Sequence, residues 1–186
     1  MDAALGSGSS AFRRIMGRFA TGVTVVAVEA AEGVHGMTAN AVTSVSLEPP
    51  LVLVCVDRRA RMHRHLAMER PFTINILRQE QEPLSRYFSG SWPYPTPPEF
   101  RFQHWEHGPL LVGALAALGC RMDRLLEAGD HTVVLGRVMG LHEGEGGLPL
   151  VFFGGRYRRL VEAEAYAGAP ADPWTHESVR IHYDEP

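Results

Sequence analysis

A chain of 186 residues with 45% hydrophobic side chains is long enough for one domain with a buried core. Its 18 basic and 21 acidic side chains leave a net charge of −3, so no dominant basic face indicates nucleic-acid binding. No apolar run is as long as a membrane span, and the N-terminus lacks the pattern of a signal peptide, so we expect a soluble cytoplasmic protein.

The N-terminal part of the chain changes character at Ser10. Residues 1–9 are mostly small, which is typical of a flexible segment. Ser10 is a suitable helix cap, and Gly22 is a suitable end for the helix that follows. We expect this helix over residues 11–19, where the apolar side chains recur at helical spacing: Phe12, Ile15, Met16 and Phe19.

A run of predicted strands follows. The first three are separated by turn residues and cover residues 23–28, 34–38 and 41–47. The pair Pro49-Pro50 excludes helix and leads in extended conformation into residues 51–56. This segment is apolar on both faces, so we expect it to be a central strand of a closed or covered sheet.

The second half of the chain combines two short helices with longer strands. The helices are predicted over residues 61–68 and 79–88. Gly113 and Gly119 disfavour a helix around them, and a long, bulged strand is expected there instead. The predicted strands cover residues 72–77, 110–126, 131–141 and 150–160, the last one interrupted at Gly154-Gly155.

Together these elements indicate a mainly β fold. About six or seven strands, few helices and no βαβ alternation favour an antiparallel barrel. We expect one domain over residues 10–160 and a C-terminal tail over residues 161–186 that is either flexible or an arm across a partner. Residues 90–109 form a predicted loop whose length is typical of a functional lid or an interface segment.

The block from residue 35 to residue 61 carries most of the candidate chemistry. Its small and polar residues would let a planar ring lie against the backbone and meet hydrogen-bonding groups. Arg58, Arg59 and Arg61 open the next predicted helix, where a phosphate could bind. The alternative is a polar hairpin beside an exposed arginine cluster. The candidate ring-contacting residues are Thr38, Ala39, Asn40, Ala41, Ser44 and Ser46.

Other familiar sites are missing from the sequence. Two cysteines, Cys55 and Cys120, do not make a disulfide framework. Scattered surface histidines are the better interpretation of His104 and His107, because zinc needs three or four converging ligands, and no metal site is expected. There is neither a Gly-x-Ser-x-Gly elbow nor a Gly-x-Gly-x-x-Gly turn after a strand.

The chain resembles the flavin reductase family with the flavin-binding split-barrel fold. No single short motif carries the resemblance, which depends on the order and spacing of several segments between residues 12 and 160. These include Gly17-Arg18-Phe19-Ala20-Thr21-Gly22-Val23-Thr24-Val25-Val26, Met37-Thr38-Ala39-Asn40, Ser44-Val45-Ser46-Leu47-Glu48-Pro49-Pro50, Gly129-Asp130-His131 and Gly154-Gly155-Arg156-Tyr157.

The resemblance implies an antiparallel Greek-key split barrel that forms a homodimer and binds FAD or FMN near the dimer interface. Residues 38–41, Ser44 and Ser46 would contact the isoalloxazine and the ribityl chain. Arg61 would meet the phosphate. The other side of the flavin would be lined by Cys55, Val56 and Asp57.

The resemblance also implies a place for the hydride donor. His131 would lie beside the nicotinamide as the catalytic residue and hold its carboxamide. The alternative is a turn histidine bonded to Asp130. Arg156 and Tyr157 would line the same pocket, or else be a strand-end arginine and a packed tyrosine.

The implied activity is that of an NAD(P)H:flavin oxidoreductase. Hydride would pass from NADH or NADPH to FAD or FMN, and the reduced flavin would diffuse to a partner monooxygenase. The residues do not decide between FAD and FMN, or between NADH and NADPH. Two other functions remain open: a flavin- or haem-binding module without reductase activity, and a split-barrel oxidase acting directly on an organic substrate.

Overall fold

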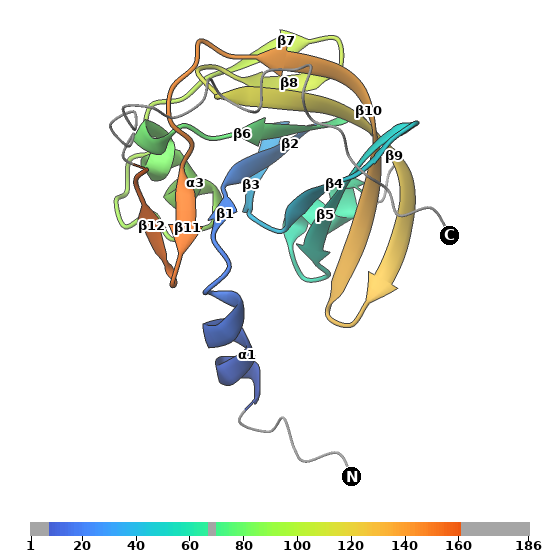
Figure 1. Ribbon diagram of the computed structural model, residues 1–186. Coiled ribbons are helices and arrows are strands. Elements are labelled where there is room, and N and C mark those ends of the chain that lie inside the picture. The colour runs from blue at the N-terminus through green and yellow to red at the C-terminus, as the bar shows by residue number, and fades with distance from the viewer. Residues whose placement is uncertain (1–7, 67–69, 161–186) are drawn as a thin grey trace, which may run out of the picture.

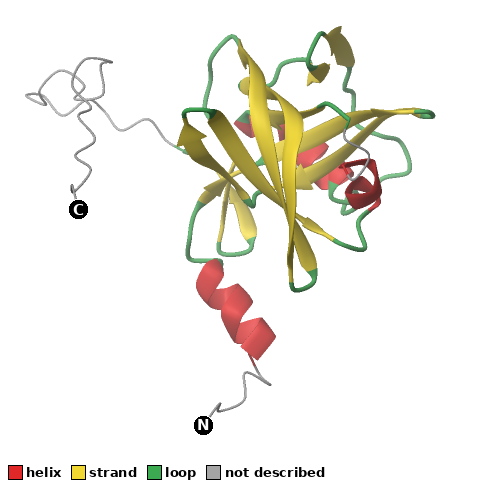
Figure 2. Ribbon diagram, turned by 90° about the vertical axis from the view of Figure 1, so that its right-hand side faces the viewer, coloured by secondary structure: helices red, strands yellow, loops and turns green. Residues whose placement is uncertain are grey.

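The computed structural model describes residues 8–66 and 70–160 as a curled antiparallel sheet with short flanking elements (Figures 1 and 2). The main sheet has seven strands in the order β3-β2-β6-β9-β10-β5-β4. In chain order, these strands are β2 (Thr24–Ala30), β3 (Gly33–Ala39), β4 (Val42–Leu47), β5 (Pro50–Asp57), β6 (Phe72–Ile76), β9 (Ala116–Ala128) and β10 (His131–Glu143).

The prediction of a mainly β, antiparallel fold is confirmed, but the sheet does not close into a barrel. Its two edge strands, β3 and β4, follow each other in the chain and do not pair with each other. The strand β5 is therefore second from an edge and not central. It is apolar on both faces because Val52, Val54 and Val56 face a buried core, whereas Leu53 and Cys55 line a cavity.

Two small β units complete the structure. The short strands β1 (Thr21–Gly22), β11 (Val151–Phe153) and β12 (Arg156–Arg158) form one sheet, and β7 (Phe102–Trp105) pairs with β8 (Gly108–Leu111). The predicted loop over residues 90–109 is therefore wrong in its second half. The strand predicted from residue 110 begins only at Ala116, because Gly113 turns the chain with a φ of 78°.

The helices are short, and one begins earlier than expected. The helix α1 (Gly8–Met16) starts before Ser10, which is therefore not its cap, and ends well before Gly22, which lies in β1. The last two residues of the predicted flexible segment are thus helical. The second helix, α2 (Arg61–Leu66), is followed further along by the 3₁₀ helix η2 (Gln79–Gln81) and α3 (Glu82–Phe88). The predicted tail, residues 161–186, lies outside the described residues.

Two apolar cores lie on opposite faces of β2. Val26 and Val28 belong to the core enclosed by the curled sheet, together with Met62 and Leu66 of α2. Val25 belongs to the second core, which α3, β8 and β11 complete. Alternate residues of one strand enter different cores because successive strand side chains point to opposite faces. No described helix is long and apolar enough to cross a membrane.

The β7–β8 hairpin docks on the main sheet through a glycine position. A Cβ added to Gly140 would collide with the imidazole ring of His107, which lies in the hairpin turn. We expect Gly140→Ala to lower the free energy of unfolding by about 1–3 kcal/mol, the usual cost of overpacking. Chemical denaturation measures this loss.

Removing the ring should relieve the collision. In the His107→Ala background, Gly140→Ala should cost clearly less than in the wild-type chain, because the two side chains then no longer meet. Equal costs in both backgrounds would show that His107 does not occupy this position.

Candidate functional site

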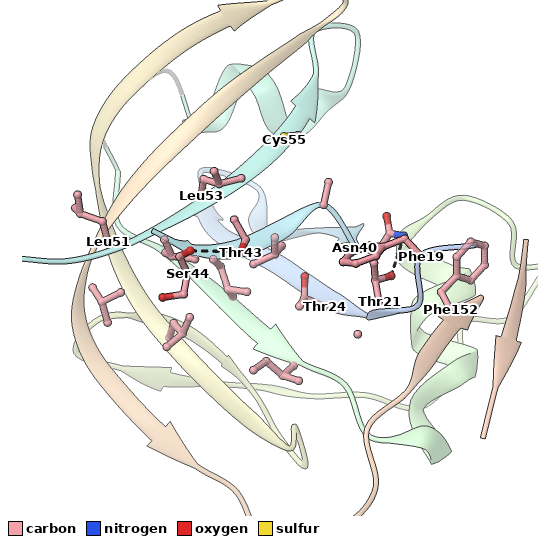
Figure 3. Close-up of a pocket in the computed structure, with 18 of the residues that line it drawn as sticks. Phe19, Thr21, Thr24, Asn40, Thr43, Ser44, Leu51, Leu53, Cys55 and Phe152 are labelled. Carbon is pink, nitrogen blue, oxygen red and sulfur yellow. Dashed lines mark hydrogen bonds between the residues drawn. The ribbon is translucent and has the colours of Figure 1, made fainter. Parts of the chain in front are cut away.

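A cavity of about 1380 Å³ opens beside the curled sheet. Figure 3 shows side chains of several strands pointing into it, with Asn40 and Phe152 near one end and Leu51 near the other. Its lining is mostly apolar, and polar groups gather on β4 and near the bend that precedes it. Five of the expected flavin-contacting residues line this cavity: Asn40, Ala41, Ser44, Ser46 and Cys55.

The bend between β3 and β4 is held by three hydrogen bonds. The Thr24 hydroxyl donates to the Ala39 carbonyl at 2.7 Å, and the Asn40 amide donates to the Thr21 hydroxyl at 3.2 Å. The Cys55 backbone N–H donates to the Ala41 carbonyl at 3.0 Å. The backbone at Ala41 is thus fixed at the cavity wall, and its methyl group leaves room for a flat ring.

Two serines of β4 line the cavity, one on each side of an irregularity in the strand. The register between β4 and β5 shifts between Ser44 and Ser46. Both serines nevertheless line the cavity. The Ser46 hydroxyl also accepts a hydrogen bond from the Glu48 N–H at 3.2 Å, which orders the turn into β5. These hydroxyls can donate to or accept from the polar edge of a heteroaromatic ring.

A second cavity of about 650 Å³ adjoins the first and shares Asn40, Phe152 and Gly155 with it. Thr38, Arg156 and Tyr157 line this second cavity. The Thr38 hydroxyl donates to the backbone carbonyl of the fully buried Ser85 at 2.7 Å. The Ser85 and Tyr157 hydroxyls share a hydrogen bond of 2.8 Å, which ties β12 to α3.

His131 lies at a separate corner, at the start of β10. Its Nδ1 is 2.7 Å from an Asp130 carboxylate oxygen, and it stands opposite Asp57 in the β5–β10 pairing. Hydrogen bonds from Arg59 hold the pKa of Asp57 well below its usual range, and the hydrogen bond with His131 lowers the pKa of Asp130. Both carboxylates therefore stay ionised at neutral pH beside the imidazole.

The remaining predicted site residues do not line either cavity. The side chains of Ala39 and Val56 belong to the buried core, so only their backbones are available to a ligand. Asp57 pairs with Arg59, and Arg61 begins α2. The roles expected for these residues and for His131 stay predictions.

Several cavity residues were not anticipated. They come from elements that only the fold brings to the site: Thr21, Thr24, Ser85, Arg86 and Phe152. Thr21 and Thr24 lie within a segment that carries the family resemblance, which was the one available signal for them. No group of three or more His, Cys, Asp or Glu side chains suited to a metal ion occurs within residues 8–66 and 70–160.

Comparison with known proteins identifies the family. The model of the flavin reductase like domain matches residues 16–161. The chain belongs to this family. It is 47% identical over 152 residues to an NADH-dependent flavin reductase of a Rhodococcus species, with 80% of this chain and 84% of the relative covered.

Two further relatives agree in sequence and in structure. The reductase component of a 4-hydroxyphenylacetate 3-monooxygenase from Thermus thermophilus is 45% identical over 151 residues, covering 81% of this chain and 96% of that protein. The structure of the NADH:FAD oxidoreductase of Streptomyces globisporus in complex with NAD and FAD fragments superimposes with a TM-score of 0.77 at 37% identity, covering 87% and 98% of the two chains.

The two thiols have different environments, which allows a test of the main cavity. Cys55 is half-buried in the cavity wall, whereas Cys120 is buried, and burial raises its pKa to about 12. We expect a thiol reagent at mildly alkaline pH to label one thiol per native chain, and Cys55→Ser to abolish labelling. Labelling of two thiols, or of none, before denaturation would contradict this assignment.

Proposed function

We propose that the chain is an NADH-dependent flavin reductase that supplies reduced FAD or FMN to a partner monooxygenase. The observation that carries the proposal is the convergence of Asn40, Ala41, Ser44, Ser46 and Cys55 on one cavity in a chain of the flavin reductase like family. The names of the relatives support NADH as the donor and a monooxygenase as the recipient of the flavin.

The chemistry is a hydride transfer that the cofactors supply. Reduced nicotinamide gives a hydride from C4 to N5 of the flavin, so the nicotinamide is oxidised and the flavin is reduced by two electrons. The chain contributes ring orientation and exclusion of water, and the transfer needs no catalytic acid–base pair. Asn40 and Ala41 would hold the flavin ring, with Ser44 and Ser46 at its polar groups.

His131 would orient the nicotinamide. Its bond to Asp130 requires a hydrogen on Nδ1, which leaves Nε2 as an acceptor for the N–H of the carboxamide if the ring is neutral. His131 does not line the main cavity. The role therefore requires the nicotinamide to extend from the flavin to His131, or a second copy of the chain to bring its own His131 to the flavin. A cytoplasmic location fits the proposed use of NADH.

The proposal is tested by following NADH oxidation with FMN, FAD and riboflavin under air. Oxidation that depends on both the protein and added flavin supports the reductase. Tight flavin binding with no NADH oxidation would instead favour a flavin-binding module. Oxidation that requires an organic substrate would favour an oxidase.

A substitution tests the residue proposed for the donor. We expect His131→Ala to raise the KM for NADH, or to slow flavin reduction, by about tenfold, the order expected for losing one hydrogen bond to the carboxamide. The Kd for flavin should stay within twofold of the wild type. Stopped-flow flavin reduction at the wild-type rate, with an unchanged KM, would refute the role.

We also propose a homodimer, because one copy leaves a broad apolar surface beside the cavity. Leu47 on β4 and Leu141 on β10 are 77% and 73% exposed, and both line the cavity. The helix α1 projects from the sheet with exposed Phe12 and Ile15 (Figure 1). Apolar side chains gathered in this way are typical of a surface that another chain covers.

The dimer is expected to separate when a charge replaces an apolar side chain on this surface. Light scattering should give twice the 20.5 kDa chain mass for the wild type and about the chain mass for Leu141→Asp. Val112→Asp, at an exposed valine in the turn after β8, is the matched control and should remain dimeric. A wild-type chain that is monomeric at micromolar concentration would contradict the proposal.

A further inference from the structure

The short helix α2 contacts the start of β10, directly beside His131. The Nε2 atom of His63 on α2 lies 2.9 Å from the hydroxyl oxygen of Thr132. We propose that His63 is a positioning residue for the hydride transfer, because its hydrogen bond to Thr132 fixes the backbone that presents His131 to the nicotinamide. The inference rests on the proposed function, which assigns the nicotinamide to His131.

The helix α2 is a firm support because its apolar side chains are fixed in the main core. Met62 and Leu66 are 0% and 1% exposed, and both pack in the core that the curled sheet encloses. They are four residues apart and therefore lie on one face of the helix. His63 follows Met62 directly, so its backbone cannot shift without disturbing a close-packed core.

Thr132 needs the partner that His63 supplies. It is 4% exposed and pairs with Val56 on β5 and with Glu127 on β9. Its side chain points to the same face of β10 as Val134, which belongs to the main core. A hydroxyl buried in such surroundings destabilises the fold unless it is hydrogen-bonded, and the imidazole of His63 provides that bond.

His131 has less support from its own contacts. Its side chain is 43% exposed, and the Asp130 side chain that it bonds is 80% exposed, so this pair alone holds the ring weakly. The Arg58 N–H donates to the Asp130 carbonyl at 3.1 Å. The residue before His131 is thus tied to the turn that leads into α2, and the residue after it is tied to α2 itself.

The contacts of α2 also provide an internal control. His63 lines neither of the two cavities formed by the described residues, so its proposed effect passes through Thr132. The other histidine of the helix, His65, contacts a different strand, because its ring centre lies 4.9 Å from that of His35 on β3. One histidine of α2 therefore meets β10 and the other meets β3, and we expect only the first to affect the use of NADH.

The hydrogen bond can be removed from either end. Thr132→Val removes the hydroxyl and keeps the β-branched shape that suits a strand, whereas Thr132→Ser keeps a hydroxyl at the same position. His63→Leu removes the other partner, and His65→Leu is the control on the same helix. The KM and kcat for NADH with FMN, the Kd for FMN from flavin fluorescence, and the Tm are measured for each variant.

We expect Thr132→Val and His63→Leu each to raise the KM for NADH about fivefold, the order expected for losing one hydrogen bond. The Kd for FMN should stay within twofold of the wild type. Thr132→Ser and His65→Leu should keep the KM within twofold. The double variant of Thr132→Val and His63→Leu should be no worse than either single variant, because both remove the same bond.

A second measurement does not depend on turnover. The imidazole resonances of His131, assigned by comparison with His131→Ala, are recorded by NMR without cofactors. We expect them to shift in His63→Leu, a change far from His131 in the chain, and to keep their wild-type positions in His65→Leu.

Two results would overturn the positioning role. One is a lower Tm for His63→Leu with an unchanged KM and unchanged His131 resonances, which would make His63 a purely structural residue. The other is an equal rise in KM for His65→Leu, which would indicate a general disturbance of α2. If the wild type oxidises no NADH with added flavin, the proposed function is refuted, and the His131 resonances alone decide whether His63 holds this corner.

Discussion

The site depends on the bend at Asn40 and Ala41, where the chain passes from one edge of the sheet to the other. Because β3 and β4 are consecutive in the chain yet lie at opposite ends of the strand order, the sheet must curl until its edges approach. The hydrogen bond from the Cys55 N–H to the Ala41 carbonyl extends the β4–β5 pairing one residue beyond Val42 and Val54, and so fixes the start of the edge strand β4. The main cavity opens at the place where the edges meet but do not pair.

This constraint also explains why small and polar residues gather at the bend. The curled sheet encloses a core that side chains of its inner strands fill, and Val26 and Val54 on strands beside the two edges are fully buried. The backbone at Asn40 and Ala41 is left at the cavity surface, where a bulky side chain would fill the space for a ring. The same bend places Asn40 between the main cavity and the arginine-lined one.

Much of the fold could be predicted from local patterns. A β-branched run indicates the strand at residues 131–141, and a short amphipathic segment indicates the helical region that η2 and α3 form. The errors arose where one residue redirects the chain, as Gly113 does, or where two short strands pair across a turn, as β7 and β8 do. Within the candidate site, the family resemblance pointed to Asn40, Ala41, Ser44 and Ser46, which line the main cavity, and to Ala39, which belongs to the buried core. Arg86 and Phe152 could not be found in this way, because pairing and packing far along the chain bring them to the site.

The central claim is that the cavity at the Asn40–Ala41 bend holds the flavin ring. A crystal structure of the chain with FMN tests this claim directly. We predict electron density for the isoalloxazine against Asn40, Ala41 and Cys55, with Ser44 and Ser46 at its polar groups. Density for the ring elsewhere, for example against α2 with the main cavity empty, would contradict the account.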